Sequence, residues 1–232
     1  WHCLEDKPRD YSGKNFTPYL GKTYSLEDVQ AAQKRIAGVI AKTPLIQYTD
    51  AVTKKLTFPK PENFQPIGTF KLRGAYNKIA SLSPRERAKG VIAFSSGNHA
   101  QGVAYAARAL GIRAVIVMPE KAPAIKKAKT LELGAEVITV DGGSEEDWRI
   151  AAEDLADRHG LTMVPPFNDE AIIAGQGTVG LEIIQELPDV ELVLVPIGGG
   201  GLISGIAAAL KLTRPSIKVV GVEPDCANDA QT

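Results

Sequence analysis

The sequence predicts an α/β protein built on open parallel sheets. Short apolar runs alternate with helix-length segments, and the runs begin 22 to 29 residues apart, the rhythm of repeated strand–helix units. They are rich in valine and isoleucine and nearly continuous, which is typical of strands that are buried on both faces. The predicted strands are Val91–Phe94, Ala114–Met118, Glu136–Val140, Thr162–Val164, Glu191–Ile197 and Lys218–Val222.

The segments between these runs are predicted to be helices that cover both faces of the sheet. Ser25–Asp28 resembles a capping box that opens a helix, and the apolar residues that share one face of it are Val29, Ala32, Ile36 and Ile40. Ser144–Asp147 resembles a second capping box. Three glycines stand where helices should end before the next strand: Gly111, Gly134 and Gly160.

The bulk composition is that of an ordinary globular protein, with 232 residues, 44% apolar and 23% charged. Lys+Arg and Asp+Glu both count 27, so net charge gives no reason to expect nucleic acid or an anionic membrane as a partner. No apolar run approaches the ~20 residues of a membrane span, and no signal peptide is recognisable. The widely separated Cys3 and Cys226 suggest neither a disulfide framework nor a zinc site. We therefore expect an intracellular, cytoplasmic location.

The domain organisation is predicted in three parts. Residues 1–24 are interpreted as an N-terminal arm. Residues 25–85 and 165–232 form a large domain, with a change near Pro165-Pro166, and residues 86–164 form a small domain. Because the sequence stops soon after an apolar strand, we expect the chain to be a fragment of a longer protein and the large domain to be incomplete at its C-terminal end.

The first chemical feature is one lysine in an apolar, glycine-flanked setting, within Gly68–Ala75. A partly desolvated lysine loses some of its preference for the charged state. Its neutral amine is a nucleophile that condenses with an aldehyde to a Schiff base. Lys71 is therefore a candidate catalytic residue, although most lysines are solvated surface residues.

Two loops follow predicted strands and open helices, which is where ligands bind in open parallel sheets. Ser95–Gly102 is small and polar, and its donors suit a carboxylate; the alternative is a simple N-cap. Gly198–Gly201 lacks every Cβ, so several backbone amides can surround one phosphate. It is not a Walker loop, because no Gly-Lys-Ser/Thr follows.

A third feature is the acidic segment after the last predicted strand. Glu223 and Asp229, with a carbonyl between them, could hold a hard cation such as Mg²⁺ or Ca²⁺. The alternative is a solvated acidic loop.

Together these features supply an amine for an aldehyde, a cradle for a phosphate and a pocket for a carboxylate, which are the needs of pyridoxal phosphate with an amino-acid substrate. The rival from another class is a nucleotide-binding oxidoreductase, since an acid follows the glycines by about 20 residues. That rival leaves Lys71 unexplained and lacks a full G-x-G-x-x-G fingerprint.

The chain resembles the fold-type II pyridoxal-phosphate enzymes, and within them the threonine/serine dehydratase (ammonia-lyase) and serine racemase branch. The resemblance covers about residues 25 to 232. It implies two three-layer open parallel-sheet domains of the tryptophan synthase β type. The motifs that carry it, in the same order as in the family, are Pro61–Asn77, Ser96–Gly102, Ala174–Thr178 and Gly198–Gly201.

The resemblance also implies residue roles. Lys71 carries the cofactor and takes the Cα proton, Phe70 packs beside the cofactor, and Asn98 hydrogen-bonds its ring hydroxyl. The substrate carboxylate is surrounded by Ser96, Gly97, Asn98 and His99, and the phosphate is cradled by Gly198, Gly199, Gly200 and Gly201. A divalent-cation site of the racemase-like members corresponds to Glu223, the carbonyl of Ala227, and Asp229.

The implied reaction is deamination of L-threonine or L-serine to 2-oxobutanoate or pyruvate plus ammonia. Ser96 matters for this choice, because racemases carry serine there as a second acid/base and many biosynthetic dehydratases carry alanine. The segments Lys60–Asn63 and Pro166–Asp169, by contrast, resemble those of the bacterial dehydratases. We expect a dehydratase on this ground, with serine racemase or 3-hydroxyaspartate dehydratase activity as the alternative. Relatives are commonly homo-oligomers. Family members continue past residue 232, so an inactive truncated fragment is the remaining alternative.

Overall fold

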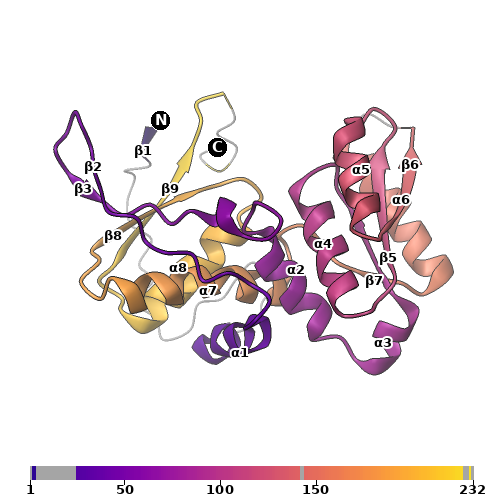
Figure 1. Cartoon of the computed structure of the whole chain (residues 1–232), viewed down its shortest axis with the longest axis horizontal. Coiled ribbons are helices and arrows are strands. Elements are labelled where there is room, and N and C mark those ends of the chain that lie inside the picture. Colours follow the sequence, from indigo (N-terminus) through magenta and orange to yellow (C-terminus); the bar gives the residue numbers. More distant parts are fainter. Residues whose placement is uncertain (1, 4–24, 142–143, 227–229, 231–232) are drawn as a thin grey trace. The chain divides into compact units, whose positions relative to one another are not determined.

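The computed structural model describes residues 2–3, 25–141, 144–226 and 230 (Figure 1). The described chain divides into two compact units. The first unit comprises the residues up to Phe70 and from Gln176 onward, and the second is Lys71–Gly175. The small domain expected at residues 86–164 falls inside the second unit. Its boundaries, and the assignment of the remaining residues to a cofactor-binding domain, stay predictions.

The second unit is built on a four-stranded parallel sheet of order β6-β5-β4-β7. Its strands are β4 (Val91–Phe94), β5 (Ala114–Pro119), β6 (Glu136–Val140) and β7 (Thr162–Met163). Every residue of β4 and β5 is buried, as the continuous apolar runs predict. The edge strand β6 is only partly buried. The predicted α/β class and parallel pairing are therefore confirmed here.

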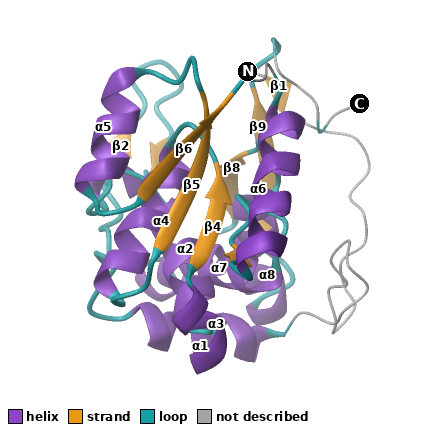
Figure 2. Ribbon diagram, turned by 90° about the vertical axis from the view of Figure 1, so that its right-hand side faces the viewer, coloured by secondary structure: helices purple, strands orange, loops and turns teal. Residues whose placement is uncertain are grey.

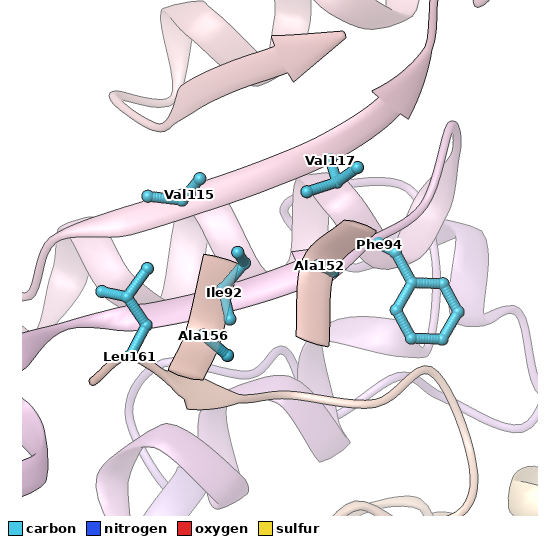
Figure 3. Close-up of a cluster of buried hydrophobic side chains, with 7 residues drawn as sticks. All are labelled: Ile92, Phe94, Val115, Val117, Ala152, Ala156 and Leu161. Atoms are coloured by element: carbon cyan, nitrogen blue, oxygen red, sulfur yellow. The ribbon is translucent and has the colours of Figure 1, made fainter. Parts of the chain in front are cut away.

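Helices cover both faces of this sheet (Figure 2). Helix α6 lies against β4 and β5 on one face, and α4 and α5 lie on the other. The helices of the unit are α2 (Lys71–Ala80), α3 (Pro84–Lys89), α4 (Asn98–Ala109), α5 (Ala124–Glu132) and α6 (Glu145–His159). A buried cluster joins β4, β5 and α6 (Figure 3), formed by Ile92, Phe94, Val115, Val117, Ala152, Ala156 and Leu161.

Local sequence signals fix several helix ends. Reciprocal capping boxes open α1 at Ser25 and α6 at Ser144, as predicted, and a third opens α3 at Ser83. Gly160 ends α6 in the left-handed region with φ 64°, a conformation that glycine adopts without steric cost. These ends are set by the chain itself rather than by distant packing.

The first unit holds a three-stranded sheet of order β1-β9-β8, with β8 (Leu192–Pro196) and β9 (Lys218–Glu223) parallel. β1 (His2–Cys3) pairs antiparallel with β9, and β2 (Tyr48–Thr49) pairs antiparallel with β3 (Leu56–Thr57). The helical segments are α1 (Leu26–Ile36), the short 3-10 helix Glu62–Phe64, α7 (Glu170–Glu186, which begins in the second unit) and α8 (Gly201–Thr213). Side chains of α7, α8 and β8, together with Ile217, form a buried apolar cluster in this unit.

Three details differ from the sequence prediction. Helix α1 ends at Ile36, so Ile40 lies outside it. β8 is not buried on both faces: Val193 and Val195 face the core, whereas Leu192 and Leu194 are 49% and 59% exposed. The described helices cover only one face of β8, which a run of apolar letters cannot reveal. The strands β1, β2 and β3 were not predicted, because two-residue strands carry too little pattern.

Within the described residues, no helix is both long and apolar enough to cross a membrane.

Candidate active site

The second unit has a topological switch point beside β4. From β4 the chain proceeds to β5 and β6 on one side, whereas β7 pairs with β4 on the other. In open parallel sheets, ligands bind beyond the carboxyl ends of the strands at such a reversal. The loops that leave these ends are residues 95–97 after β4 and residues 164–169 after β7, which we call the β7–α7 turn.

Lys71, the candidate nucleophile, is the first residue of α2 and reaches this turn. Its Nζ donates a hydrogen bond to the carbonyl of Pro166 at 2.6 Å and lies 5.9 Å from the centroid of the Phe167 ring. Helix α4 packs closely against the start of α2 at Gly102, where a Cβ would lie 3.3 Å from the Lys71 carbonyl group. The backbone of Lys71 is thus held by helix packing, and its amine by the β7–α7 turn.

Burial lowers the pKa of the Lys71 amine from 10.5 to about 8, while the negative charge of Glu145 acts in the opposite direction. Near neutral pH an appreciable fraction of such an amine is unprotonated. A neutral amine can act as a nucleophile or accept a proton. The structure therefore gives Lys71 the properties that the sequence pattern suggested.

His99 lies in the first turn of α4 and is 3% exposed. Its Nε2 lies 2.8 Å from the carbonyl oxygen of Val164, which can only accept, so Nε2 carries the proton. The pKa of this imidazole is lowered to about 4, mainly by burial. The hydrogen bond to Val164 acts to raise the pKa, and the positive charge of Lys71 acts to lower it. His99 is thus neutral at pH 7. It fixes the start of the β7–α7 turn rather than offering a positive charge to a carboxylate.

The polar loop before α4 does not serve as a side-chain cap. The N-cap is Gly97, and no side chain in the described structure caps this helix. The Ser95 hydroxyl instead accepts a hydrogen bond from the Gly97 N–H at 3.1 Å. Ser96 is half-buried and Asn98 is exposed. The first N–H groups of α4 have no intrahelical partners, so this helix start can bind an anion. The loop therefore provides α4 with no side-chain cap, and its role in binding a carboxylate stays a prediction.

The glycine loop is a feature of the first unit. It follows β8 and opens α8, with Gly200 as the N-cap in the left-handed region at φ 81°. A Cβ built on Gly198 or Gly200 meets no heavy atom of the described residues within 4 Å, so these residues leave open space above both glycines. A glycine cannot cap through a side chain, and the N–H groups that begin α8 suit a phosphate.

Of the candidate metal ligands, only Glu223 is described; Ala227 and Asp229 lie outside the described residues. Glu223 ends β9 and is 7% exposed. Its Oε1 accepts a hydrogen bond from the Ala230 N–H at 3.1 Å, whereas its buried Oε2 has no hydrogen-bond partner among the described atoms. The described residues contain no cluster of three or more metal-binding side chains. A buried carboxylate oxygen without a donor suits a cation.

The sequence indicated Pro166–Asp169 only as a segment resembling the bacterial dehydratases, and it predicted no contact between Lys71 and Pro166 or Phe167. The position of the pair in the loop after β7 was the available signal, because residues after strands at a switch point line the site. The two adjacent prolines were instead interpreted as a domain boundary. Which carbonyl would face Lys71 depends on tertiary packing and could not be deduced from the letters.

Comparison with protein families gives a match over residues 36–232 to the family described as "Pyridoxal-phosphate dependent enzyme". The chain belongs to this family. It is 50% identical over 203 residues to an L-threonine ammonia-lyase of Thermotoga maritima, covering 87% of this chain and 50% of that protein. It is 48% identical over 204 residues to a catabolic L-threonine dehydratase of Staphylococcus aureus, covering 87% of this chain and 59% of that protein.

Among solved structures, maize serine racemase matches with a TM-score of 0.85 and 41% identity, covering 88% of this chain and 63% of that one. The chain thus spans 50% to 63% of the length of these three relatives. The predicted family and fold class are confirmed.

The residues present fit pyridoxal phosphate. The second unit provides a partly buried amine with a lowered pKa, and the first provides a side-chain-free loop with open space above it. An aldehyde and a phosphate group require these two features. The family match gives no support to the alternative of a nucleotide-binding oxidoreductase.

Proposed function

We propose that the protein is a pyridoxal-phosphate dependent lyase that deaminates L-threonine or L-serine to 2-oxobutanoate or pyruvate plus ammonia. The observation that carries this proposal is the Lys71 amine, partly buried at a topological switch point with its pKa lowered to about 8. The relatives at 50% and 48% identity are named as an L-threonine ammonia-lyase and an L-threonine dehydratase.

When bound, pyridoxal phosphate supplies an electron sink for the electron pair that remains when the substrate Cα loses its proton. In this proposal Lys71 binds the cofactor and its Nζ accepts that proton, for which a pKa near working pH is suited. The N–H groups at the start of α4, with Ser96 to Asn98, would bind the substrate carboxylate, and Asn98 would contact the ring hydroxyl. Phe70 would pack beside the ring.

We assign the cofactor phosphate to Gly198, Gly199, Gly200 and Gly201. Backbone amides that open a helix bind an anion without needing a side chain, and any Cβ at Gly198 would occupy the open space. His99 would hold the start of α4 against the β7–α7 turn through its hydrogen bond to Val164, and it would not contribute a positive charge.

Racemisation is the second candidate activity, favoured by the half-buried Ser96 and by the 41% identity to maize serine racemase. Ser96 would then act as a second acid/base. A divalent cation at Glu223, Ala227 and Asp229 is a further proposal, supported by the Glu223 Oε2, which has no hydrogen-bond partner among the described atoms. A homo-oligomer is proposed from the family resemblance. A cytoplasmic location is proposed because the two cysteines are far apart in the sequence.

The test begins with the purified protein and pyridoxal phosphate. We expect a yellow complex that borohydride fixes covalently to Lys71, located by peptide mass spectrometry. Incubation with L-threonine, L-serine and 3-hydroxyaspartate, followed by assays for oxo acid and D-enantiomer, then ranks the substrates. Lys71→Ala should abolish turnover and labelling with little change in folding, and the exposed Lys129→Ala serves as the matched control. Turnover near wild type in Lys71→Ala refutes the proposal. A wild-type protein that stays colourless and inactive with pyridoxal phosphate would also contradict the proposal.

A further inference from the structure

A second lysine of α2 binds the far end of the β7–α7 turn. Lys78 Nζ lies 2.7 Å from Asp169 Oδ2, and the two side chains are only 21% and 18% exposed. Lys78 follows Lys71 by seven residues in the same helix. Since seven residues make about two helical turns, both lysines lie on one face of α2. That face therefore contacts the turn at Pro166 through Lys71 and at Asp169 through Lys78.

Asp169 connects this ion pair to the start of α7. Its Oδ1 accepts hydrogen bonds from the N–H groups of Ala171 at 2.9 Å and Ile172 at 3.1 Å, so the side chain caps α7. Its own N–H donates to the Phe167 carbonyl at 3.2 Å. Asp169 thus joins α2 to the first turn of α7 through its carboxylate, and it bonds to Phe167, whose ring lies near Lys71, through its backbone N–H.

The β7–α7 turn has few backbone N–H groups that could hold it in place by hydrogen bonds. Pro165 and Pro166 have no N–H groups, so neither can donate to a neighbouring backbone. At the other end, His99 holds the Val164 carbonyl at 2.8 Å. The Pro166 carbonyl and the Phe167 ring are therefore placed largely by anchors on both sides, His99 before them and the Lys78–Asp169 pair after them.

We propose that Lys78 and Asp169 are positioning residues for Lys71, whose ion pair fixes the β7–α7 turn so that Pro166 and Phe167 orient the amine and shield it from water. The assignment of a reactive Lys71 rests on the proposed function. Loosening the anchor admits water to Nζ, and a better solvated amine favours its charged form. Both residues act through the turn and touch no reacting atom.

The test measures Lys71 itself in the cofactor-free protein. Competitive acetylation with acetic anhydride from pH 7 to 10, read from the Lys71 peptide by mass spectrometry, gives the pH midpoint of its reactivity. Lys78→Met removes the cation and keeps much of the apolar stem. Asp169→Asn removes the charge and keeps an oxygen for the cap, since asparagine and aspartate cap comparably. We expect each variant to raise the midpoint by about one pH unit, which slows acetylation at pH 8 about fivefold.

The double variant should shift the midpoint no further than either single variant, because both remove one shared interaction. Lys78→Arg, which keeps a cation, should restore wild-type labelling. The control is Arg113→Met, which breaks the half-exposed Arg113–Glu136 pair of the same unit, with its N–O distance of 2.7 Å. That variant should leave the Lys71 midpoint unchanged.

An unchanged midpoint in Lys78→Met or Asp169→Asn, even with a lower melting temperature, overturns the proposal, since the pair would then be structural only. If Lys78→Met fails to fold, Asp169→Asn and Lys78→Arg decide the question. Failure of the wild type to take up pyridoxal phosphate would count against the proposed function alone, because the labelling measurement uses no cofactor.

Discussion

His99 makes the stability of the second unit sensitive to mild acid. Its folded-state pKa of about 4 lies below the ordinary value of 6.5. Above pH 6.5 the imidazole is neutral in both the folded and the unfolded chain, so it carries no penalty. Below pH 6.5 the unfolded chain takes up a proton that the folded chain resists, and the free energy of unfolding falls.

The magnitude follows from the two pKa values. Linkage between protonation and folding lowers the free energy of unfolding by about 2 kcal/mol at pH 5 and about 3 kcal/mol at pH 4, relative to pH 8. The perturbation that isolates this contribution is His99→Gln, because a glutamine amide can donate to the Val164 carbonyl but does not titrate. Carboxylates elsewhere titrate equally in both proteins, so the difference between them reports His99.

The assay is urea unfolding at pH 8, 6, 5 and 4.5, followed by tryptophan fluorescence. Trp148 packs against the core of the second unit, and a Trp1→Phe background makes it the only tryptophan in the sequence. We expect the wild type to lose stability faster than the variant as the pH falls below 6.5. Parallel loss in both proteins would refute the reasoning, since His99 would then have an ordinary pKa in the folded state.

Three further predictions test the glycines and Ser96. Gly198→Ala should keep the free energy of unfolding within about 0.5 kcal/mol of wild type, because no heavy atom of the described residues lies within 4 Å of the new Cβ. It should nevertheless weaken pyridoxal phosphate binding about tenfold or more in a spectroscopic titration, and unchanged binding would speak against the phosphate assignment. Gly175→Ala should cost about 3 kcal/mol in urea unfolding, because its Cβ would lie 2.6 Å from the Gly74 Cα, and a near-neutral effect would contradict this packing. Ser96→Ala should reduce D-enantiomer formation more than oxo-acid formation; equal loss of both would leave Ser96 only a carboxylate-binding role.

The parts of the fold that the sequence predicted well are those encoded locally. The apolar strands of the second unit and the capping boxes at Ser25 and Ser144 depend on neighbouring residues, and the structure confirms them. The one-sided burial of β8 depends on which helices cover it, and the pattern of letters carries no such information. The predicted domain boundaries remain to be tested.

The candidate site shows the same division. Lys71 stood out because a lone lysine among apolar residues and glycines is locally unusual. Its partners did not, because the Pro166 carbonyl belongs to a segment 95 residues away in sequence. The lowered pKa of His99 likewise arises from burial, which only the folded chain determines. The residue types thus indicated which side chains could react, whereas tertiary packing determines the surroundings of those side chains.

The acceptor that Lys71 contacts is a main-chain oxygen, and no codon change can delete a main-chain oxygen. Mutation at position 166 alters the ring attached to the backbone but leaves a carbonyl in place. Natural variation and protein engineering can therefore tune this contact only by moving the peptide group, through residues that shape its path. Replacing the peptide bond between Pro166 and Phe167 with an ester by chemical synthesis would make this carbonyl a weaker acceptor, while every side chain stays unchanged.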